Sequence, residues 1–323
     1  MILYIEKEAK PYNLAQHILK NFPNASCIEI NNYKNIFDKK IPLHHELSII
    51  IAKLNAPAIT KTPPQYWHSK HCYFLKTSLN CVFDCRYCFL KWAFKNKFLV
   101  YFVNYEDIKN QIIKQVALDE KNNISPVRYY SWDYSDILWA CQMNNFLQEF
   151  VWVFEKFSNT YLEIRTKQAN IKAIFELWYI PKNTEFAFSL NPQILIEKYE
   201  KWTSSLEERL KTINILLKKW YKVGLRFLPL LPVKNYQEIY TDFVNEIKQK
   251  IDIWQIHSIF VSWLLYTKDD YNKILQKDPL LDILYALHDE WDGFVRLKKE
   301  TRDFFYTLFT TLHKETKICL DTF

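Results

Sequence analysis

The stretch Asn80-Cys-Val-Phe-Asp-Cys-Arg-Tyr-Cys-Phe89 holds three cysteines, Cys81, Cys85 and Cys88, in a C-x3-C-x2-C spacing. Three thiolates on one short segment can bind three irons of a cubane iron–sulfur cluster. The fourth iron then has no protein ligand and is free to bind a small molecule. The spacing therefore predicts a 4Fe-4S cluster with one open iron.

Zinc is the alternative for a cysteine-rich loop. A structural zinc site needs a fourth ligand, which would have to be Cys72, His71 or His68, and none of these stands at a spacing typical of zinc sites. Three unconnected core thiols are a further alternative, although Asp84 and Arg86 make the surroundings polar. The remaining cysteines are scattered and are predicted to be small buried hydrophobic residues: Cys27, Cys141 and Cys319.

Composition predicts a globular chain. With 323 residues, 49% of them hydrophobic and 17% aromatic, it can bury a large core in one or two domains. Seven cysteines without regular spacing do not resemble a disulfide framework, and a cluster with an open iron favours a reducing compartment, so we expect a cytoplasmic protein.

No membrane or secretory segment is expected. The first residues lack a basic stretch followed by an apolar run, and the apolar run at 258–266 is too short to span a bilayer. A formal charge of +7 suits a polyanionic partner, but it is equally explained by solubility. The only two glycines, Gly224 and Gly293, exclude a P-loop and a G-x-G-x-x-G nucleotide turn, because both motifs need several glycines.

Hydrophobic periodicity predicts an α/β fold. Residues 1–50 are expected to form a small α/β unit with strands at 3–6 and 27–30 and a helix at 14–21, followed by an extended connection at 55–69. Six further strands alternate with helices, which is typical of a parallel sheet curled into a partial barrel; they are expected at 73–76, 127–131, 161–166, 185–190, 224–230 and 254–260. A helix is predicted at 205–221, with Ser204 or Ser205 as its cap. Ligands of such folds bind at the carboxyl ends of the strands, and the cysteine loop follows the first strand of this series.

These boundaries predict three regions. They are a small N-terminal α/β unit with its connection at 1–70, a core partial barrel at 71–260, and a helical C-terminal region at 261–323.

The cysteine string resembles the radical S-adenosylmethionine superfamily, whose signature has an aromatic residue before the last cysteine, here Tyr87. Further strings look like the spore photoproduct lyase family: Val103-Asn-Tyr-Glu-Asp-Ile108, Tyr134-Ser-Asp136, Ile164-Arg-Thr-Lys167, Phe188-Ser-Leu-Asn-Pro192 and Glu200 to Arg209 with its Thr203-Ser-x-x-x-x-Arg. The strings Asp292-Gly-Phe-x-Arg296 and Arg302 with Tyr306 are similar more weakly.

The resemblance implies a partial (β/α)6-type radical SAM barrel whose cysteines bind a 4Fe-4S cluster and whose open iron binds S-adenosyl-L-methionine. In the family, one electron cleaves this cofactor to methionine and a 5′-deoxyadenosyl radical, which takes hydrogen from the substrate. In the lyase itself that substrate is a thymine dimer in spore DNA. The electron donor would be a protein such as flavodoxin or ferredoxin. By resemblance, Ser135, Lys167, Ser189 and Tyr87 are the cofactor-binding positions.

The residues agree with three of these positions, because Ser135, Lys167 and Ser189 each lie at the end of a predicted strand. Lys167 is the strongest candidate, since a cation beside a cofactor carboxylate gains a charge-assisted hydrogen bond. A solvated lysine, and turn or cap serines, are the alternative roles.

The chain departs from the family pattern at two positions. The family's hydrogen-donating cysteine is replaced by Asp133, and its radical-relaying tyrosine, which follows the third cluster cysteine, by Phe89. Cys141 is the candidate replacement donor, if its helix turns the thiol toward the cofactor.

The leading hypothesis is a radical S-adenosylmethionine enzyme acting on a DNA pyrimidine photolesion or another nucleic-acid target. A radical enzyme acting on a peptide or small molecule is one alternative. A non-enzymatic nucleic-acid-binding protein carrying a cluster or zinc is another. Basic residues interleaved with aromatic ones at 91–97 and 296–302 are candidate phosphate contacts or solvated helix faces.

Overall fold

The computed structural model describes residues 1–39, 48–63, 71–131, 134–289, 292–313 and 317–318. It divides into two compact units. The first comprises Met1–Val82, Ala93–Thr166 and Asn170–Thr184, and the second comprises Phe83–Trp92, Lys167–Ala169 and Glu185–Phe323. The three regions expected from the sequence, with boundaries at 70 and 260, are a different partition and stay a prediction.

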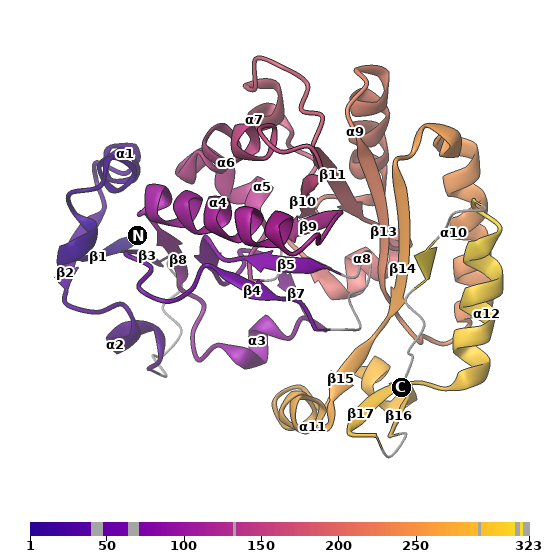
Figure 1. Cartoon of the computed structure of the whole chain (residues 1–323). Helices are drawn as coiled ribbons and strands as arrows, with labels where there is room; N and C mark the ends of the chain where they lie inside the picture. Colours follow the sequence, from indigo (N-terminus) through magenta and orange to yellow (C-terminus); the bar gives the residue numbers. More distant parts are fainter. Residues whose placement is uncertain (40–47, 64–70, 132–133, 290–291, 314–316, 319–323) are drawn as a thin grey trace. The chain divides into compact units, whose positions relative to one another are not determined.

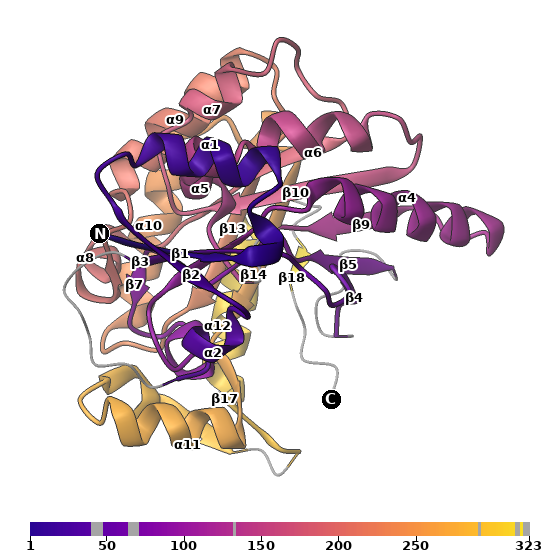
Figure 2. The same ribbon diagram turned by 90° about the vertical axis from the view of Figure 1, so that its left-hand side faces the viewer.

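Part of the first unit is a sheet whose described strands run in the order β2-β1-β3-β8-β6 (Figures 1 and 2). These strands are β1 Ile2–Glu6, β2 Ser26–Ile30, β3 Ser48–Ala52, β8 Leu99–Phe102 and β6 Ser78–Leu79. All pairs are parallel except β6 with β8. The predicted strands and helix of residues 1–30 are confirmed, because β1, α1 (Asn13–Asn21) and β2 lie where the periodicity places them.

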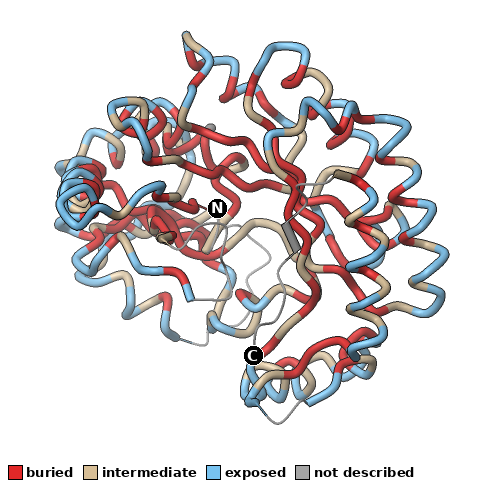
Figure 3. The backbone as a smooth tube through the Cα atoms, turned by 45° about the vertical axis from the view of Figure 1, so that its right-hand side comes forward, coloured by how far each residue is buried: buried red, intermediate tan, exposed pale blue. Residues whose placement is uncertain are grey.

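The prediction that Cys27 is buried is wrong. Cys27 is exposed because β2 is an edge strand of this sheet, and all but the last of its residues face solvent. In contrast, every residue of β3, in the middle of the sheet, is buried. Apolar residues of β1, β3 and β8 form one core together with Ala15 and Ile18 of α1. Buried stretches of the backbone are red in Figure 3.

The first unit also contains a run of strands in the order β10-β9-β5-β4. The strands are β4 Ile59–Lys61, β5 Cys72–Leu75, β9 Val127–Tyr130 and β10 Thr160–Thr166, of which only β4 is antiparallel to its neighbour. The helices of this unit are η1 Lys7–Ala9, α1, α2 Lys34–Phe37, α4 Tyr105–Lys121, α5 Ile137–Asn144, α6 Phe146–Phe154 and α7 Lys172–Phe175. The predicted strands at 73–76, 127–131 and 161–166 are confirmed to within one residue at each end.

Parallel strands in the order β18-β14-β13-β11 form the second unit's main sheet. They are β11 Thr184–Ser189, β13 Val223–Leu230, β14 Ser258–Trp263 and β18 Lys317–Ile318. Its longer helices are α8 Gln193–Tyr199, α9 Leu206–Lys218, α10 Tyr236–Lys250, α11 Lys268–Lys277 and α12 Lys299–Thr310. Helices α10 and α12 lie side by side against β13, where the Phe227 ring contacts Phe243 and Phe309 (Figure 1).

The predicted helix at 205–221 is α9, and it begins where its capping sequence indicates. The Ser205 hydroxyl accepts from the Glu208 backbone N–H, and the Glu208 carboxylate accepts from the Ser205 N–H, which completes a capping box. The predicted strand at 254–260 is wrong at its start, because Ile253–Gln255 is a 3-10 turn capped by the Asp252 side chain and β14 begins at Ser258.

The C-terminal region is helical, as expected, but it also holds a small antiparallel sheet in the order β15-β17-β16. Its strands are β15 Leu265–Thr267, β16 Leu287–Asp289 and β17 Phe294–Leu297, with the short helix η4 Asp282–Ala286 before β16. Strands of three or four residues are too short for an alternating pattern to stand out in the sequence. Among the described residues, no helix is both long and apolar enough to cross a membrane.

Candidate active site

The cluster loop, defined here as Phe83–Trp92 with the start of α3 (Leu90–Ala93), is anchored within the second unit by its backbone. Its strand β7 (Asp84–Cys85) pairs antiparallel with β12 (Glu200–Lys201), which sets Cys85 opposite Glu200. The next residue, Arg86, donates its backbone N–H to the carbonyl of Tyr199 at 2.7 Å. The segment between the second and third cysteines therefore has a defined conformation.

A bidentate ion pair fastens the same loop from its side chains. The Arg86 guanidinium donates to the Asp278 carboxylate, with Nη2 2.9 Å from Oδ1 and Nε 3.1 Å from Oδ2. Two parallel charge-assisted bonds fix orientation as well as distance. A second ion pair joins Lys91 Nζ to Asp84 Oδ1 at 2.9 Å within the loop.

Tyr87 is held by hydrogen bonds at its side-chain hydroxyl and at its backbone carbonyl. Its hydroxyl donates to a carboxylate oxygen of Glu200, and its backbone carbonyl accepts from the Tyr266 hydroxyl at 2.6 Å. Burial, followed by the negative charges of Glu200 and Cys85, raises the pKa of Tyr87 well above its usual value. The phenol therefore stays protonated and acts as a donor.

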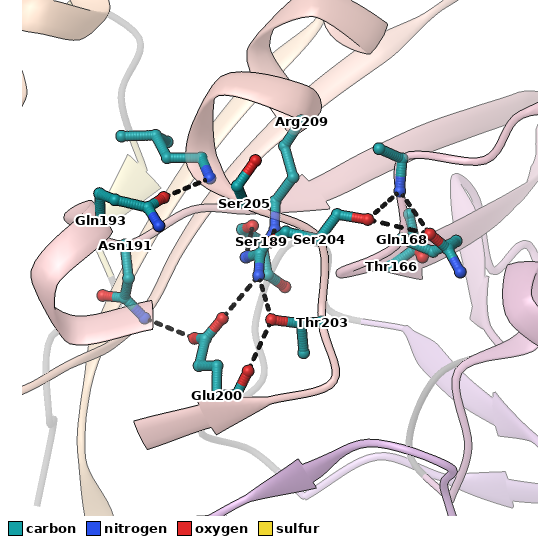
Figure 4. A network of polar contacts seen from close by, with 12 residues as sticks. Thr166, Gln168, Ser189, Asn191, Gln193, Glu200, Thr203, Ser204, Ser205 and Arg209 are labelled. Atoms are coloured by element: carbon teal, nitrogen blue, oxygen red, sulfur yellow. Dashed lines mark hydrogen bonds and ion pairs between the residues drawn. The ribbon is translucent and has the colours of Figure 1, made fainter. Parts of the chain in front are cut away.

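Glu200 and Arg209 form the centre of the polar network shown in Figure 4. Both side chains are 0% exposed, and Arg209 Nη2 lies 2.8 Å from Glu200 Oε2. The Asn191 amide donates to the other carboxylate oxygen at 2.9 Å. Burial opposes ionisation of Glu200, but Arg209 and Lys167 outweigh it and hold the pKa of Glu200 below its usual value. The carboxylate is therefore charged.

Lys167 lies beside the cluster loop, with its ammonium nitrogen 5.9 Å from the centroid of the Tyr87 ring. Burial by itself lowers the pKa of this lysine, but the negative charges of Glu200, Cys85 and Cys88 outweigh burial and raise it. The following residues are tied to the start of α9, because the Ser204 hydroxyl accepts from the Ala169 N–H and donates to the Gln168 side chain, both at 2.9 Å. A cation is thus kept beside Tyr87, in the loop that carries Cys85 and Cys88.

Ser189 ends β11 and is buried. Its carbonyl accepts from Arg209 Nη1 at 2.8 Å. Asn191, two residues further on, donates to Glu200 and accepts from the Tyr240 hydroxyl at 3.3 Å. Of the four predicted cofactor-binding residues, three therefore lie in the second unit around one network: Tyr87, Lys167 and Ser189.

Within the part of the chain that the structure describes, none of the three predicted cluster ligands forms a disulfide. Cys85 is buried and Cys88, whose N–H donates to the Cys85 carbonyl at 3.1 Å, is half-buried. Cys81 belongs to the first unit, where the side chain of Asn80 accepts from its N–H and donates to the Phe98 carbonyl. No three described His, Cys, Asp or Glu side chains converge as the ligands of a single metal ion would. A cubane cluster has a different requirement, because each thiolate binds a separate iron.

Ser135 and Cys141 lie in the first unit. Asp136, next to Ser135, caps α5 by accepting from the Trp139 N–H at 3.1 Å, and it also accepts from the Thr166 hydroxyl at 2.9 Å. The end of β10 and the start of α5 are thereby joined through Asp136, the residue after Ser135. Cys141 is buried in α5, as the sequence predicts, and burial raises the pKa of its thiol far above the usual value.

Sequence reasoning assigned no role to the network residues Asn191, Glu200 and Arg209. All three lie inside the strings that resemble the lyase family, and this location is the feature of the sequence that marks them as candidate site residues. Charged residues in such a pattern are expected on the surface, so burial of the pair could not be anticipated. Asp133, Cys319 and His68 lie outside the described residues.

The family model for spore photoproduct lyase matches residues 1–280. The chain belongs to the spore photoproduct lyase family. Spore photoproduct lyase of Clostridium acetobutylicum is 24% identical over 278 residues, which are 85% of this chain and 81% of that protein. That of Bacillus subtilis is 25% identical over 255 residues, which are 76% of this chain and 72% of that protein.

Solved structures of spore photoproduct lyase have the same fold. A variant with bound AdoMet and dinucleoside spore photoproduct gives a TM-score of 0.82 at 17% identity, covering 99% of this chain and 98% of that one. A complex with dinucleoside spore photoproduct gives the same TM-score at 18% identity. The predicted fold class, a partial radical SAM barrel, and the predicted membership in this enzyme family are therefore confirmed.

Proposed function

We propose that this member of the spore photoproduct lyase family binds a 4Fe-4S cluster through Cys81, Cys85 and Cys88 and binds S-adenosyl-L-methionine beside it. The observation that supports this most directly is the position of Lys167, whose ammonium lies next to Tyr87 and is influenced by the charges of Cys85 and Cys88. Soft thiolates suit iron, and a lysine suits a carboxylate. The residues present therefore fit both groups.

Four residues of the protein have proposed roles in binding and orienting the cofactor. Lys167 holds the cofactor carboxylate. Ser189, at the end of β11, and Ser135, just before α5, supply polar contacts. Tyr87 presents a fixed ring beside the cluster. When bound, the cluster and cofactor together supply a 5′-deoxyadenosyl radical after one-electron reduction, for which a flavodoxin or ferredoxin is a suitable donor.

The proposed substrate is a pyrimidine photolesion in DNA or a related nucleic-acid target. A relative of the same fold was solved with dinucleoside spore photoproduct, and this chain carries a formal charge of +7, which suits a polyanion. The basic clusters predicted at 91–97 and 296–302 offer fewer phosphate contacts than their sequence indicates. Arg296 is buried, and Lys91 is paired with Asp84. Lys95 and Lys97 are exposed.

The chain differs from its family at both positions associated with hydrogen transfer. Asp133 and Phe89 stand where the family has a cysteine and a tyrosine, and neither an aspartate carboxylate nor a phenylalanine ring readily gives up a hydrogen atom. Cys141 is the proposed substitute, although its thiol is buried in the first unit. A radical reaction on a peptide or small molecule is the second candidate, favoured by this missing donor.

The test is anaerobic reconstitution, reduction in the presence of S-adenosylmethionine, and an assay for 5′-deoxyadenosine, with Cys85→Ala as the control. We expect product from the wild type and none from the variant. No product from a protein with a spectroscopically intact cluster contradicts both radical proposals.

Substrate choice needs a second experiment. Binding to irradiated and plain thymine-containing oligonucleotides is compared over a range of salt concentrations, and repaired thymine is then measured for the wild type, Cys141→Ala and Asp133→Cys. Selective binding of irradiated DNA, with a repair yield raised by Asp133→Cys, supports the lesion substrate. Equally weak binding to both oligonucleotides favours a peptide or a small molecule as the substrate.

A further inference from the structure

Glu200 holds several segments of the second unit together at one point. Its side chain is completely buried, and its two carboxylate oxygens face three donors, namely the Tyr87 hydroxyl, the Asn191 amide and the Arg209 guanidinium. These donors come from the cluster loop, from the residues after β11, and from α9. Hydrogen bonds to a charged carboxylate are short and directional. One side chain therefore determines how the three segments meet.

The cluster loop depends on this carboxylate for the orientation of Tyr87. The Tyr266 hydroxyl fixes the backbone carbonyl of Tyr87, and Glu200 fixes the far end of the ring. With both ends held, the Tyr87 side chain cannot swing to another rotamer without breaking a buried hydrogen bond. That ring lies beside the Lys167 ammonium.

Arg209 extends the arrangement to the other predicted cofactor contacts. Its Nη1 donates to the Ser189 carbonyl at 2.8 Å, and its Nε donates to the Ser204 carbonyl at 2.9 Å. The Ser204 hydroxyl in turn accepts from Ala169, two residues after Lys167. The pair of Glu200 and Arg209 is thus connected by hydrogen bonds to Tyr87 and Ser189 themselves, and to the segment that carries Lys167. Figure 4 shows the part of this network around Glu200, Arg209 and Ser189.

We infer that Glu200 is a positioning residue of the cofactor site, which together with Arg209 keeps Tyr87, Lys167 and Ser189 in the arrangement that binds S-adenosylmethionine. The inference rests on the function proposed above. Glu200 itself does not touch the reacting atoms in this proposal. Its loss should therefore weaken cofactor binding while the thiolates still hold iron.

The experiment compares Glu200→Gln and Tyr87→Phe with the control Glu185→Gln. Glu185 is a matched control because it is also a buried glutamate of the second unit, ion-paired with Arg226 at 3.1 Å on neighbouring strands. Each protein is reconstituted anaerobically. Iron and sulfide content, the dissociation constant for S-adenosylmethionine, and the EPR spectrum of the reduced cluster before and after cofactor addition are then measured.

We expect all variants to retain wild-type iron content. Glu200→Gln should bind the cofactor about 10- to 100-fold more weakly, the range seen when outer-shell partners of metal sites are lost, and should show an altered cofactor-dependent EPR change. Tyr87→Phe should share the altered spectrum, because it removes only the hydroxyl that Glu200 holds. Glu185→Gln should match the wild type in affinity and spectrum even where it lowers stability.

The outcomes separate the two proposals. A wild-type protein that holds its cluster but binds no S-adenosylmethionine overturns the proposed function and this inference with it. Wild-type binding together with an unchanged Glu200→Gln overturns the inference alone, as does an equal loss in Glu185→Gln. Should Glu200→Gln fail to fold, wild-type affinity and spectrum in Tyr87→Phe overturn the inference.

Discussion

The carboxylate of Glu200 and the guanidinium of Arg209 form an ion pair 2.8 Å long in which both side chains are fully buried. Every guanidinium nitrogen of Arg209 has a hydrogen-bond acceptor, since Ser189, Ser204 and Thr203 provide the remaining contacts. Removing one partner of such a pair leaves an uncompensated charge in a buried site. This pair is therefore expected to matter for stability as well as for the site.

Arg209→Ala should lower the free energy of unfolding by about 3–5 kcal/mol, because it leaves the Glu200 carboxylate buried without its cation. Urea denaturation of the cluster-free protein measures the change. The control is Lys250→Ala, which breaks the exposed pair of Lys250 and Glu246 on α10, and this should cost no more than about 1 kcal/mol. Similar costs for the two variants would contradict the prediction.

Cys85→Ala should abolish cluster binding and 5′-deoxyadenosine formation. With only two thiolates left, the cubane loses the ligand of a third iron. Iron and sulfide analysis after anaerobic reconstitution checks this. Cys27→Ala is the matched control, because that thiol is exposed on the edge strand β2, and it should keep full iron content. Iron retained by Cys85→Ala would mean that the loop is not the cluster site.

Asp282 should make stability depend on pH in the acid range. Burial opposes its ionisation, but hydrogen bonds from Lys198 and Tyr199, both 2.7 Å long, hold the pKa of Asp282 below its usual value of about 3.9. As the pH falls, the unfolded chain binds the proton first. The stabilisation from Asp282 is therefore present above about pH 4 and is lost as the pH falls through the lower, folded-state pKa.

The measurement is denaturation of the cluster-free protein at several pH values between about 6 and 3, bracketing the ordinary aspartate pKa. Asp282→Asn should lose less stability over this interval than the wild type. Asp242→Asn, at an exposed position of α10, should follow the wild-type curve. Parallel curves for the wild type and Asp282→Asn would rule out this role.

Gly224→Ala should destabilise the second unit by crowding the buried pair of Glu185 and Arg226. A Cβ at this position would lie 2.3 Å from Glu185 Oε1 and 2.6 Å from Arg226 Nη1. These side-chain ends cannot move away cheaply, since both are buried and Arg226 also donates to the Ser258 hydroxyl at 2.9 Å. Overpacking of this kind costs about 1–3 kcal/mol.

A double-mutant cycle tests the cause of that cost. Because Gly224→Ala already disturbs the ion pair, Glu185→Gln should cost less in the Gly224→Ala background than in the wild type. Urea denaturation of the wild type, the two single variants and the double variant supplies the four free energies of unfolding. Additive costs would show that the alanine acts without displacing Glu185.

Much of the fold follows from short-range patterns. The strands predicted within 1–30 and 127–230 and the helices predicted at 14–21 and 205–221 lie where periodicity places them, and Ser205 with Glu208 forms the cap that its sequence indicates. The strand expected from Trp254 fails because Asp252 caps a short turn instead. The sheet of β15, β16 and β17 was not foreseen because its strands are too short to carry a pattern.

The candidate site divides in the same way. The spacing of Cys81, Cys85 and Cys88 and the family strings around them are properties of the chain alone, because ligand type and local spacing need no neighbours to be recognised. Other features depend on which segments pack together. They are the exposure of Cys27, the burial of Glu200 and Arg209, and the hydrogen bond from Tyr87 to Glu200. Burial and ion pairing are set by residues distant in sequence, so these features emerged only when the folded chain brought α9, β12 and the cluster loop into contact.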